Sequence, residues 1–345
     1  MTRPRKTLLI ALLAVLPLAA QAQTAPVYGP RLEGFDYPHP VRTFRLTSQN
    51  QALEMAYMDV KPAKPGASAK AGATNKEART VVLLHGKNFC AATWDGTIAA
   101  LTGAGYRVIA PDQIGFCKSS KPQHYQYSFE QLAANTRALL LSLDLKKVTI
   151  MGHSMGGMLA ARFALTYPDM TEQLVSVNPL GLEDGRAKGV PWTSVDDLYK
   201  SALNTDAAGI RQYQQSVYYA GTWKPDYDKW VEMQAGMYRG TGKQVMAWNS
   251  ALTSEMIYTQ PVVHELERLK MPVLLLIGDK DTTGRSNRAP KDVRPTLGNF
   301  PAMSEAAAKR IPHAKLVRFA ELGHSPQIQD PARFHAALLE GLKIN

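Results

Sequence analysis

Short apolar runs alternate with amphipathic segments along most of this 345-residue chain. Continuous aliphatic runs predict buried strands, and apolar residues at helical spacing predict the helices between them. Together they predict an α/β fold, with a doubly wound, mostly parallel sheet covered by helices on both faces. The expected strands are Thr80–Leu84, Tyr106–Ala110, Val148–Met151, Leu174–Val177, Pro272–Ile277 and Ala314–Phe319, and the expected helices are Trp94–Gly103, Ser128–Leu143, Met155–Tyr167 and Asp330–Leu342.

Two regions before this pattern have a different character. Residues 24–40 are rich in proline and are expected to be irregular, whereas Val41–Thr47 and Ala52–Val60 alternate in the manner of an antiparallel pair. Lys61–Ala78 is rich in Pro, Gly, Ala, Ser and Lys, so it is expected to be a flexible loop with no chemistry of its own.

The strand pattern lapses between residues 186 and 262. This segment holds four of the five tryptophans and seven of the fourteen tyrosines, with no convincing buried strand. It predicts a helical insertion that caps the active site and divides the core domain into residues 23–185 and 263–345. Its aromatic residues favour an apolar or aromatic substrate group, although most of the tryptophans are expected to form the insertion's own small core. These tryptophans are Trp192, Trp223, Trp230 and Trp248.

The first 22 residues have the pattern of a secretory signal peptide. Met1–Lys6 is basic, Thr7–Ala20 is apolar, and Ala20-Gln-Ala22 is a small-x-small cleavage site. An uncleaved anchor is the alternative, but the apolar run is shorter than the roughly 20 residues that span a bilayer. Cleavage after Ala22 predicts an exported protein, periplasmic or secreted, with no stable membrane span.

Charge alters this picture little. The formal net charge is +11, and it falls to +8 without Arg3, Arg5 and Lys6, since no acidic residue precedes position 23. The remaining basic residues are scattered, and no zinc-finger spacing or aromatic RNA-binding motif accompanies them. Nucleic acid is therefore not an expected partner, and a small-molecule substrate is.

The residues from Val148 to Gly157 carry the strongest chemical signal. They read Val-Thr-Ile-Met-Gly-His-Ser-Met-Gly-Gly, which is a strand, then Gly-x-Ser-x-Gly, then a predicted helix. Gly152 and Gly156 leave room for a tight turn, and the helix directs free N–H groups toward the serine. Ser154 is the candidate nucleophile.

A nucleophilic serine needs a base, and the base needs a carboxylate that orients it. Two strand ends supply candidates: Pro272–Ile277 continues into Asp279 and Asp281, and Ala314–Phe319 continues toward His324. Active-site groups of parallel sheets gather at the carboxyl ends of strands. Serine, aspartate and histidine then follow in the order nucleophile, acid, base.

Five motifs in order resemble those of the α/β-hydrolase family. They are Leu-Leu-His-Gly ending at Gly86, Tyr-Arg-Val-Ile-Ala-Pro-Asp ending at Asp112 with the following Gly115 and Ser119, Gly-His-Ser-Met-Gly around Ser154, Gly-Asp-Lys-Asp ending at Asp281, and Gly-His ending at His324. The resemblance implies that Asp281 is the triad acid. Asp279 is the alternative for that role, although a turn-forming or helix-capping aspartate is the expected function of that residue. It also implies an oxyanion hole formed by the backbone N–H groups of Lys87 and Met155, with the Asn88 side chain as a possible donor.

Cys90 and Cys117 are the only two cysteines. An export signal implies an oxidising compartment, and each cysteine follows a strand that enters the same face of the sheet, so a bridge between them is plausible. The alternative is two buried free thiols. Where family members commonly have the second glycine of Gly-x-Gly-x-Ser, this chain has Cys117, which favours the bridge.

These features predict an exported serine hydrolase that cleaves a carboxylic ester, with an apolar or aromatic acyl group, through an acyl-enzyme. The same triad suits carbon–carbon bond hydrolysis or cofactor-free peracid formation, and a non-catalytic ligand-binding protein is the alternative from another class. No pattern for a metal or organic cofactor occurs. A loop bearing Arg285, Arg288, Lys291 and Arg294 either attracts an anionic substrate or partner or is simply solvated.

Overall fold

The computed structural model describes residues 24–62, 78–286 and 288–343. The expected signal peptide, and residues 63–77 of the expected loop Lys61–Ala78, lie outside the described residues. One eight-stranded sheet organises the rest, in the order β1-β2-β4-β3-β5-β6-β7-β8. Its strands are β1 (Val41–Ser48), β2 (Gln51–Val60), β3 (Thr80–Leu84), β4 (Arg107–Pro111), β5 (Val148–His153), β6 (Thr171–Val177), β7 (Val273–Gly278) and β8 (Ala314–Phe319).

Strand direction follows the expectation from sequence. β1 pairs antiparallel with β2, and β2 pairs antiparallel with β4. From β4 to β8 every neighbouring pair is parallel. The predicted α/β fold with a mostly parallel sheet is confirmed.

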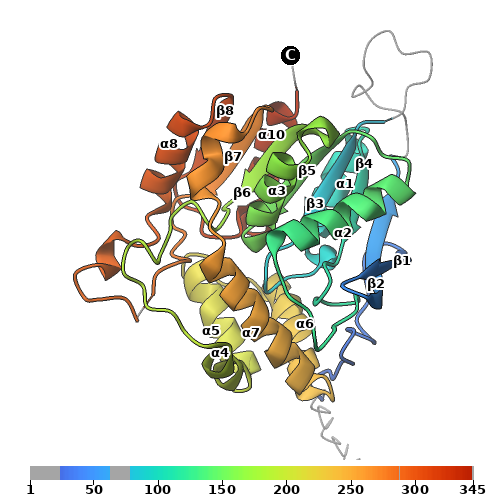
Figure 1. Cartoon of the computed structure of the whole chain (residues 1–345), viewed down its shortest axis with the longest axis vertical. Helices are drawn as coiled ribbons and strands as arrows, with labels where there is room; N and C mark the ends of the chain where they lie inside the picture. The colour runs from blue at the N-terminus through green and yellow to red at the C-terminus, as the bar shows by residue number, and fades with distance from the viewer. Residues whose placement is uncertain (1–23, 63–77, 287, 344–345) are drawn as a thin grey trace, which may run out of the picture.

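Helices cover both faces of this sheet (Figure 1). Successive residues of β3 point to opposite faces, so Val82 packs in one buried cluster and Val81 in the other. The first cluster includes α2 (Phe129–Ser142), α3 (Met155–Thr166) and α8 (Phe300–Arg310), and the second includes α1 (Asp95–Gly103) and α10 (Pro331–Gly341). Burial on both faces explains why the central strands are almost wholly apolar.

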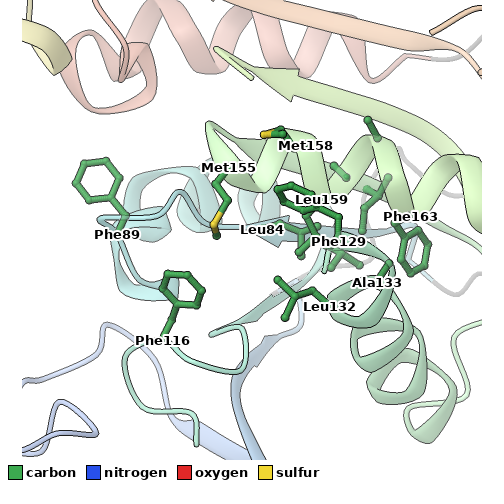
Figure 2. Close-up of a cluster of buried hydrophobic side chains, with 14 of the residues drawn as sticks. Leu84, Phe89, Phe116, Phe129, Leu132, Ala133, Met155, Met158, Leu159 and Phe163 are labelled. Carbon is green, nitrogen blue, oxygen red and sulfur yellow. The ribbon is translucent and has the colours of Figure 1, made fainter. Parts of the chain in front are cut away.

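Part of the first cluster lies next to the predicted nucleophile. Figure 2 shows Phe89, Phe116 and Met155 at the opposite end of the drawn residues from Phe163. Met155 is the first residue of α3 and is fully buried. The start of α3, and with it Ser154, is therefore fixed by close packing.

The segment between β6 and β7 forms the expected helices. They are α4 (Val195–Ala202), α5 (Ala207–Tyr213), α6 (Asp228–Arg239) and α7 (Lys243–Thr259), and residues 178–272, all described, contain no strand. Figure 1 shows these four helices gathered below the sheet. We call residues 186–262 the helical insertion. Among the described residues, no helix is both long and apolar enough to cross a bilayer.

Candidate active site

Ser154 lies between β5 and α3 in a left-handed conformation, with φ 59° and ψ −122°. A Cβ on Gly152 would lie 1.9 Å from the carbonyl oxygen of Gly156, and a Cβ on Gly156 would lie 2.2 Å from that of Leu84. Only glycine fits at both positions, because strand and helix approach too closely for a side chain. The sequence pattern Gly-x-Ser-x-Gly thus builds a strained turn with serine at its apex.

His324 and Asp281 lie together at the carboxyl ends of β8 and β7. His324 Nδ1 is 2.6 Å from Asp281 Oδ2, and both side chains are fully buried. A proton on Nδ1 donates to the carboxylate, so Nε2 is the nitrogen left to act as a base. Nε2 is buried and has no hydrogen-bond partner among the described residues. The imidazole is oriented as a general base requires.

His153, the residue before Ser154, contacts His324. The His153 ring lies 4.7 Å from the His324 ring, between centroids, and His153 Nε2 donates to the His324 carbonyl oxygen at 2.8 Å. No hydrogen bond joins the Ser154 hydroxyl to His324 in this structure, and such bonds are often long before substrate binds. Burial, followed by the nearby His324, holds the pKa of His153 well below its usual value, which suits a packing role.

Asp279, the alternative acid, points elsewhere. Its carboxylate pairs with the Arg318 guanidinium, with Oδ2 2.8 Å from Nη2. Arg318 also pairs with Glu305 on α8. Asp279 lies in the turn directly after β7, as the sequence predicted, and its carboxylate joins an ion-pair network with Arg318 of the outer strand β8.

Asn178 is a site residue that the sequence analysis missed. It follows β6 with φ 38° and donates from Nδ2 to Asp281 Oδ2 at 2.9 Å. The same side chain accepts from the backbone N–H of Gly278 at 2.9 Å. It therefore positions both the carboxylate and the strand end that carries it. A polar residue directly after a buried strand was the available signal, as it was for Asp281.

The expected oxyanion donors lie at the turns after β3 and β5. The backbone N–H groups of Lys87 and Met155 have no acceptor within the described part of the chain. Free amides beside the start of a helix can stabilise negative charge on a substrate oxygen. The Asn88 side chain instead donates to the Tyr218 hydroxyl at 2.9 Å.

Comparison with known proteins identifies the family. A model of the alpha/beta hydrolase fold matches residues 79–331, which is most of the chain. The chain belongs to the α/β-hydrolase family. This α/β-hydrolase is 60% identical to a "probable hydrolytic enzyme" from Pseudomonas aeruginosa PAO1, whose crystal structure matches with a TM-score of 0.88 over 93% of this chain and 99% of that one.

Two curated relatives are more distant. "Putative carbamate hydrolase RutD" from Pantoea ananatis is 24% identical over 79% of this chain and 91% of that protein. A 2-hydroxy-6-oxononadienedioate/2-hydroxy-6-oxononatrienedioate hydrolase from Comamonas testosteroni is 32% identical over 36% of this chain and 44% of that protein. These relatives, with the fold, identify the protein as a hydrolase with a small-molecule substrate.

Tyr218 is a second residue that sequence analysis did not single out in this α/β-hydrolase. It ends a π-helical turn, Gln214–Tyr218, within the helical insertion, and its ring centroid lies 4.9 Å from that of His324. Its carbonyl oxygen accepts from the Ser325 N–H at 3.2 Å. π-Helical turns are rare in proteins, and those that occur are often found at functional sites. The aromatic content of the insertion pointed to this region without indicating which ring covers the histidine.

A disulfide joins Cys90 and Cys117, with their Cα atoms 5.9 Å apart. Cys117 has φ 43°, the left-handed conformation that explains why the family commonly has glycine there. The bridge ties the loop after β3, which carries Lys87, to the loop after β4. It therefore restrains one side of the expected oxyanion hole.

Cavities lie between the helical insertion and the sheet domain. One of about 40 Å³ is bounded by Lys87, Asn88, the disulfide and residues of α6 and α7. Another of about 210 Å³ is bounded by residues 179–183, α7 and the loop after Asp281. Apolar side chains, among them Met233, Met237 and Phe300, supply much of both walls. The space beside the loops after β3 and β6 thus suits a small, largely apolar ligand.

The tryptophans of the helical insertion differ in burial, whereas the basic residues of the loop after Asp281 are all exposed. Trp230 is buried, and Trp223 packs against the core, but Trp192 is 61% exposed and contributes to no core. The four basic side chains of the loop after Asp281, namely Arg285, Arg288, Lys291 and Arg294, are all exposed. The solvated interpretation of that loop therefore fits its structure.

Proposed function

We propose that this α/β-hydrolase is an exported serine hydrolase that cleaves a carboxylic ester through an acyl-enzyme. The observation that carries the proposal is the 2.6 Å hydrogen bond between His324 Nδ1 and Asp281 Oδ2, at the strand ends next to Ser154. This bond fixes the imidazole tautomer that a serine nucleophile needs. Nε2, which has no hydrogen-bond partner in the described part of the chain, is the atom that would take the serine proton.

The reaction follows from these positions. His324 Nε2 takes the Ser154 Oγ proton as Oγ bonds to the ester carbonyl carbon, and the carbonyl electron pair moves onto oxygen. The backbone N–H groups of Lys87 and Met155 stabilise that oxyanion. Collapse expels the alcohol, which receives the proton from His324, and leaves the acyl-enzyme. Water then loses a proton to His324 as it attacks the acyl carbon. Collapse of this second intermediate releases the acid, and His324 returns the proton to Ser154 Oγ.

A direct test replaces Ser154 by alanine. Turnover of p-nitrophenyl butyrate should fall by about 10⁴-fold or more, because residual rates without a nucleophile come only from binding and the oxyanion hole. Ser142→Ala is the matched control, since Ser142 is an exposed serine at the end of α2. A Ser154→Ala variant that is folded by circular dichroism and turns the ester over normally would refute the proposal.

A fluorophosphonate probe separates catalysis from mere binding. The native protein should be labelled at Ser154, identified by mass spectrometry of the modified peptide, and the Ser154→Ala variant should not be labelled. No labelling of the native protein would favour the alternative, a non-catalytic ligand-binding protein on this fold.

Carbon–carbon bond hydrolysis is a second candidate, favoured by the relative from Comamonas testosteroni that is named for such substrates. It would use the same Ser154, His324 and Asp281. Kinetic comparison of simple esters, lactones and vinylogous diketones decides between the two, because the better substrate class has the higher kcat/KM. Peracid formation, the third use of this triad, would appear as acyl transfer to added hydrogen peroxide.

Export rests on residues 1–22 and on the disulfide, which is of a kind that persists in oxidising compartments. Expression of the full chain followed by fractionation and N-terminal sequencing should give a periplasmic or secreted protein beginning at Gln23. A cytosolic protein that retains residues 1–22 would refute this part of the proposal.

A further inference from the structure

Lys87 places an ammonium group in a cavity that holds no opposite charge. Its side chain bounds the cavity of about 40 Å³ between the loop after β3 and helices α6 and α7, and Nζ donates to Ser250 Oγ at 2.8 Å. Among the described residues that bound this cavity, none is an aspartate, glutamate, arginine or histidine. Lys87 is therefore the only group there that carries a formal charge at neutral pH.

A partly buried ammonium with a single neutral partner is an unusual arrangement. Lysine has three N–H donors, and one hydroxyl acceptor satisfies one of them. Burial lowers the pKa of Lys87 to about 8, and no carboxylate contributes to that pKa. At pH 7 about nine-tenths of the side chains are still cationic. The cavity thus pairs apolar walls with a positive charge that has room for an anionic partner.

We propose that Lys87 binds a carboxylate of the substrate, so that the preferred ester is anionic, with an apolar chain between its free carboxylate and the scissile carbonyl. This inference rests on the proposed serine-hydrolase function. The same residue supplies a candidate oxyanion amide from its backbone, and its side chain bounds the cavity, so one residue would contact both ends of such an ester. The apolar chain would contact the cavity residues Phe89, Met233 and Met237.

The test compares p-nitrophenyl monoesters of dicarboxylic acids with neutral alkanoates of matched length. Mono-p-nitrophenyl adipate is paired with p-nitrophenyl heptanoate, and spontaneous hydrolysis is subtracted. We expect the wild-type protein to favour the adipate, and Lys87→Met to lower the adipate-to-heptanoate ratio of kcat/KM by about tenfold or more, the range of a charge-assisted hydrogen bond. Lys87→Arg should retain a preference for the adipate.

Two controls separate this role from a structural one. Lys309→Met removes the same charge from an exposed position on α8 and should leave the ratio unchanged. The adipate preference should also decline as pH rises through about 8, as the Lys87 ammonium loses its proton. If Lys87 only bridges to Ser250, the Lys87→Met variant loses stability but keeps the wild-type ratio, and the inference is overturned.

Binding to the Ser154→Ala variant distinguishes this inference from the proposed function. Titration calorimetry with monomethyl adipate should show binding that the added Lys87→Met substitution weakens by about tenfold. Triad-dependent heptanoate hydrolysis without any adipate preference would overturn the inference and leave the proposed function standing. Lys87-dependent binding without turnover of any ester would support the binding of a carboxylate by Lys87 and overturn the proposed function.

Discussion

The carboxylate of Asp281 accepts hydrogen bonds from His324, from Asn178 and from the backbone N–H of Thr283 at 2.7 Å. Asp279, two residues away, pairs with Arg318 on the surface. Sequence offered both aspartates at one strand end, and the side-chain directions distinguish them. An aspartate whose oxygens are all directed to buried partners can orient a histidine, whereas a surface ion pair cannot.

Replacing each aspartate by asparagine tests this distinction. Asp281→Asn should lower kcat by about 10⁴-fold, because an amide can favour the wrong histidine tautomer. Asp279→Asn should keep kcat within about tenfold of wild type and cost about 1 kcal/mol of stability. Steady-state kinetics on one chromogenic ester and urea unfolding measure the two effects. Equal losses of kcat in both variants would contradict the assignment.

Asn178 should matter for both stability and rate. Asn178→Gly keeps the backbone free to adopt φ 38° but removes the amide that binds Asp281 and Gly278. We expect a loss of about 1–3 kcal/mol in unfolding free energy, since buried partners are left unsatisfied, and about a tenfold or larger fall in kcat. Asn178→Ala should be less stable than Asn178→Gly, because alanine is strained at positive φ. A glycine variant with wild-type kcat would exclude a positioning role.

At the scale of elements, the sequence predicted those strands and helices that have a clear local pattern of apolar residues. The central strands and helices lie within a few residues of their expected positions because full burial on both faces makes each run apolar. No helix was predicted between Leu297 and Ala314, where α8 lies. Its Asn299 cap and Pro301 mark a helix start, but only Phe300, Ser304 and Ala307 are buried, so the apolar signal is weak.

The disulfide connects the loops that follow β3 and β4, two neighbouring strands of the sheet. Its removal should lower unfolding free energy by about 3.5 kcal/mol, since the two cysteines lie 27 positions apart in the sequence. The double variant Cys90→Ala with Cys117→Gly should be about 1 kcal/mol more stable than Cys90→Ala with Cys117→Ala, because Cys117 has φ 43°. Urea unfolding compares the two. Equal stability would mean that the backbone at residue 117 relaxes once the bridge is gone.

At the scale of the whole molecule, the chain segment before β1 links the helical insertion to the sheet domain. The Tyr28 N–H donates to the Gly236 carbonyl of α6 at 3.0 Å, and Lys118 Nζ donates to the Leu32 carbonyl at 3.0 Å. The proline-rich composition of residues 24–40 predicted only an irregular segment. Tyr28 and Gly236 are about two hundred residues apart in sequence, and no local pattern can predict a contact of that range. The insertion is therefore held by this segment as well as by its own two connections.

Buried histidines should make the stability of the whole fold depend on pH. Burial lowers the pKa of His85, and it lowers that of His153 well below the usual value. In the unfolded chain both return to about 6.5, so below that pH the unfolded state binds protons that the folded state does not. Unfolding free energy should therefore fall as pH drops through about 6.5. Burial also lowers the pKa of Lys121 to about 7 and that of Lys87 to about 8, so unfolding free energy should continue to rise above these pH values while the unfolded lysines keep their protons. His335, which is partly buried with a lowered pKa, acts in the same direction.

Urea unfolding at about pH 7.5 and about pH 5.5 measures this dependence. Each histidine that stays neutral in the fold should cost about 1.4 kcal/mol over that interval. Carboxylates contribute mainly below about pH 5, because their unfolded pKa values lie near 4. His153→Gln removes one such proton while keeping an amide that can donate to the His324 carbonyl. Its loss between the two pH values should be smaller than that of the wild-type protein by about 1.4 kcal/mol, and an equal loss in both would show that His153 is protonated within the fold.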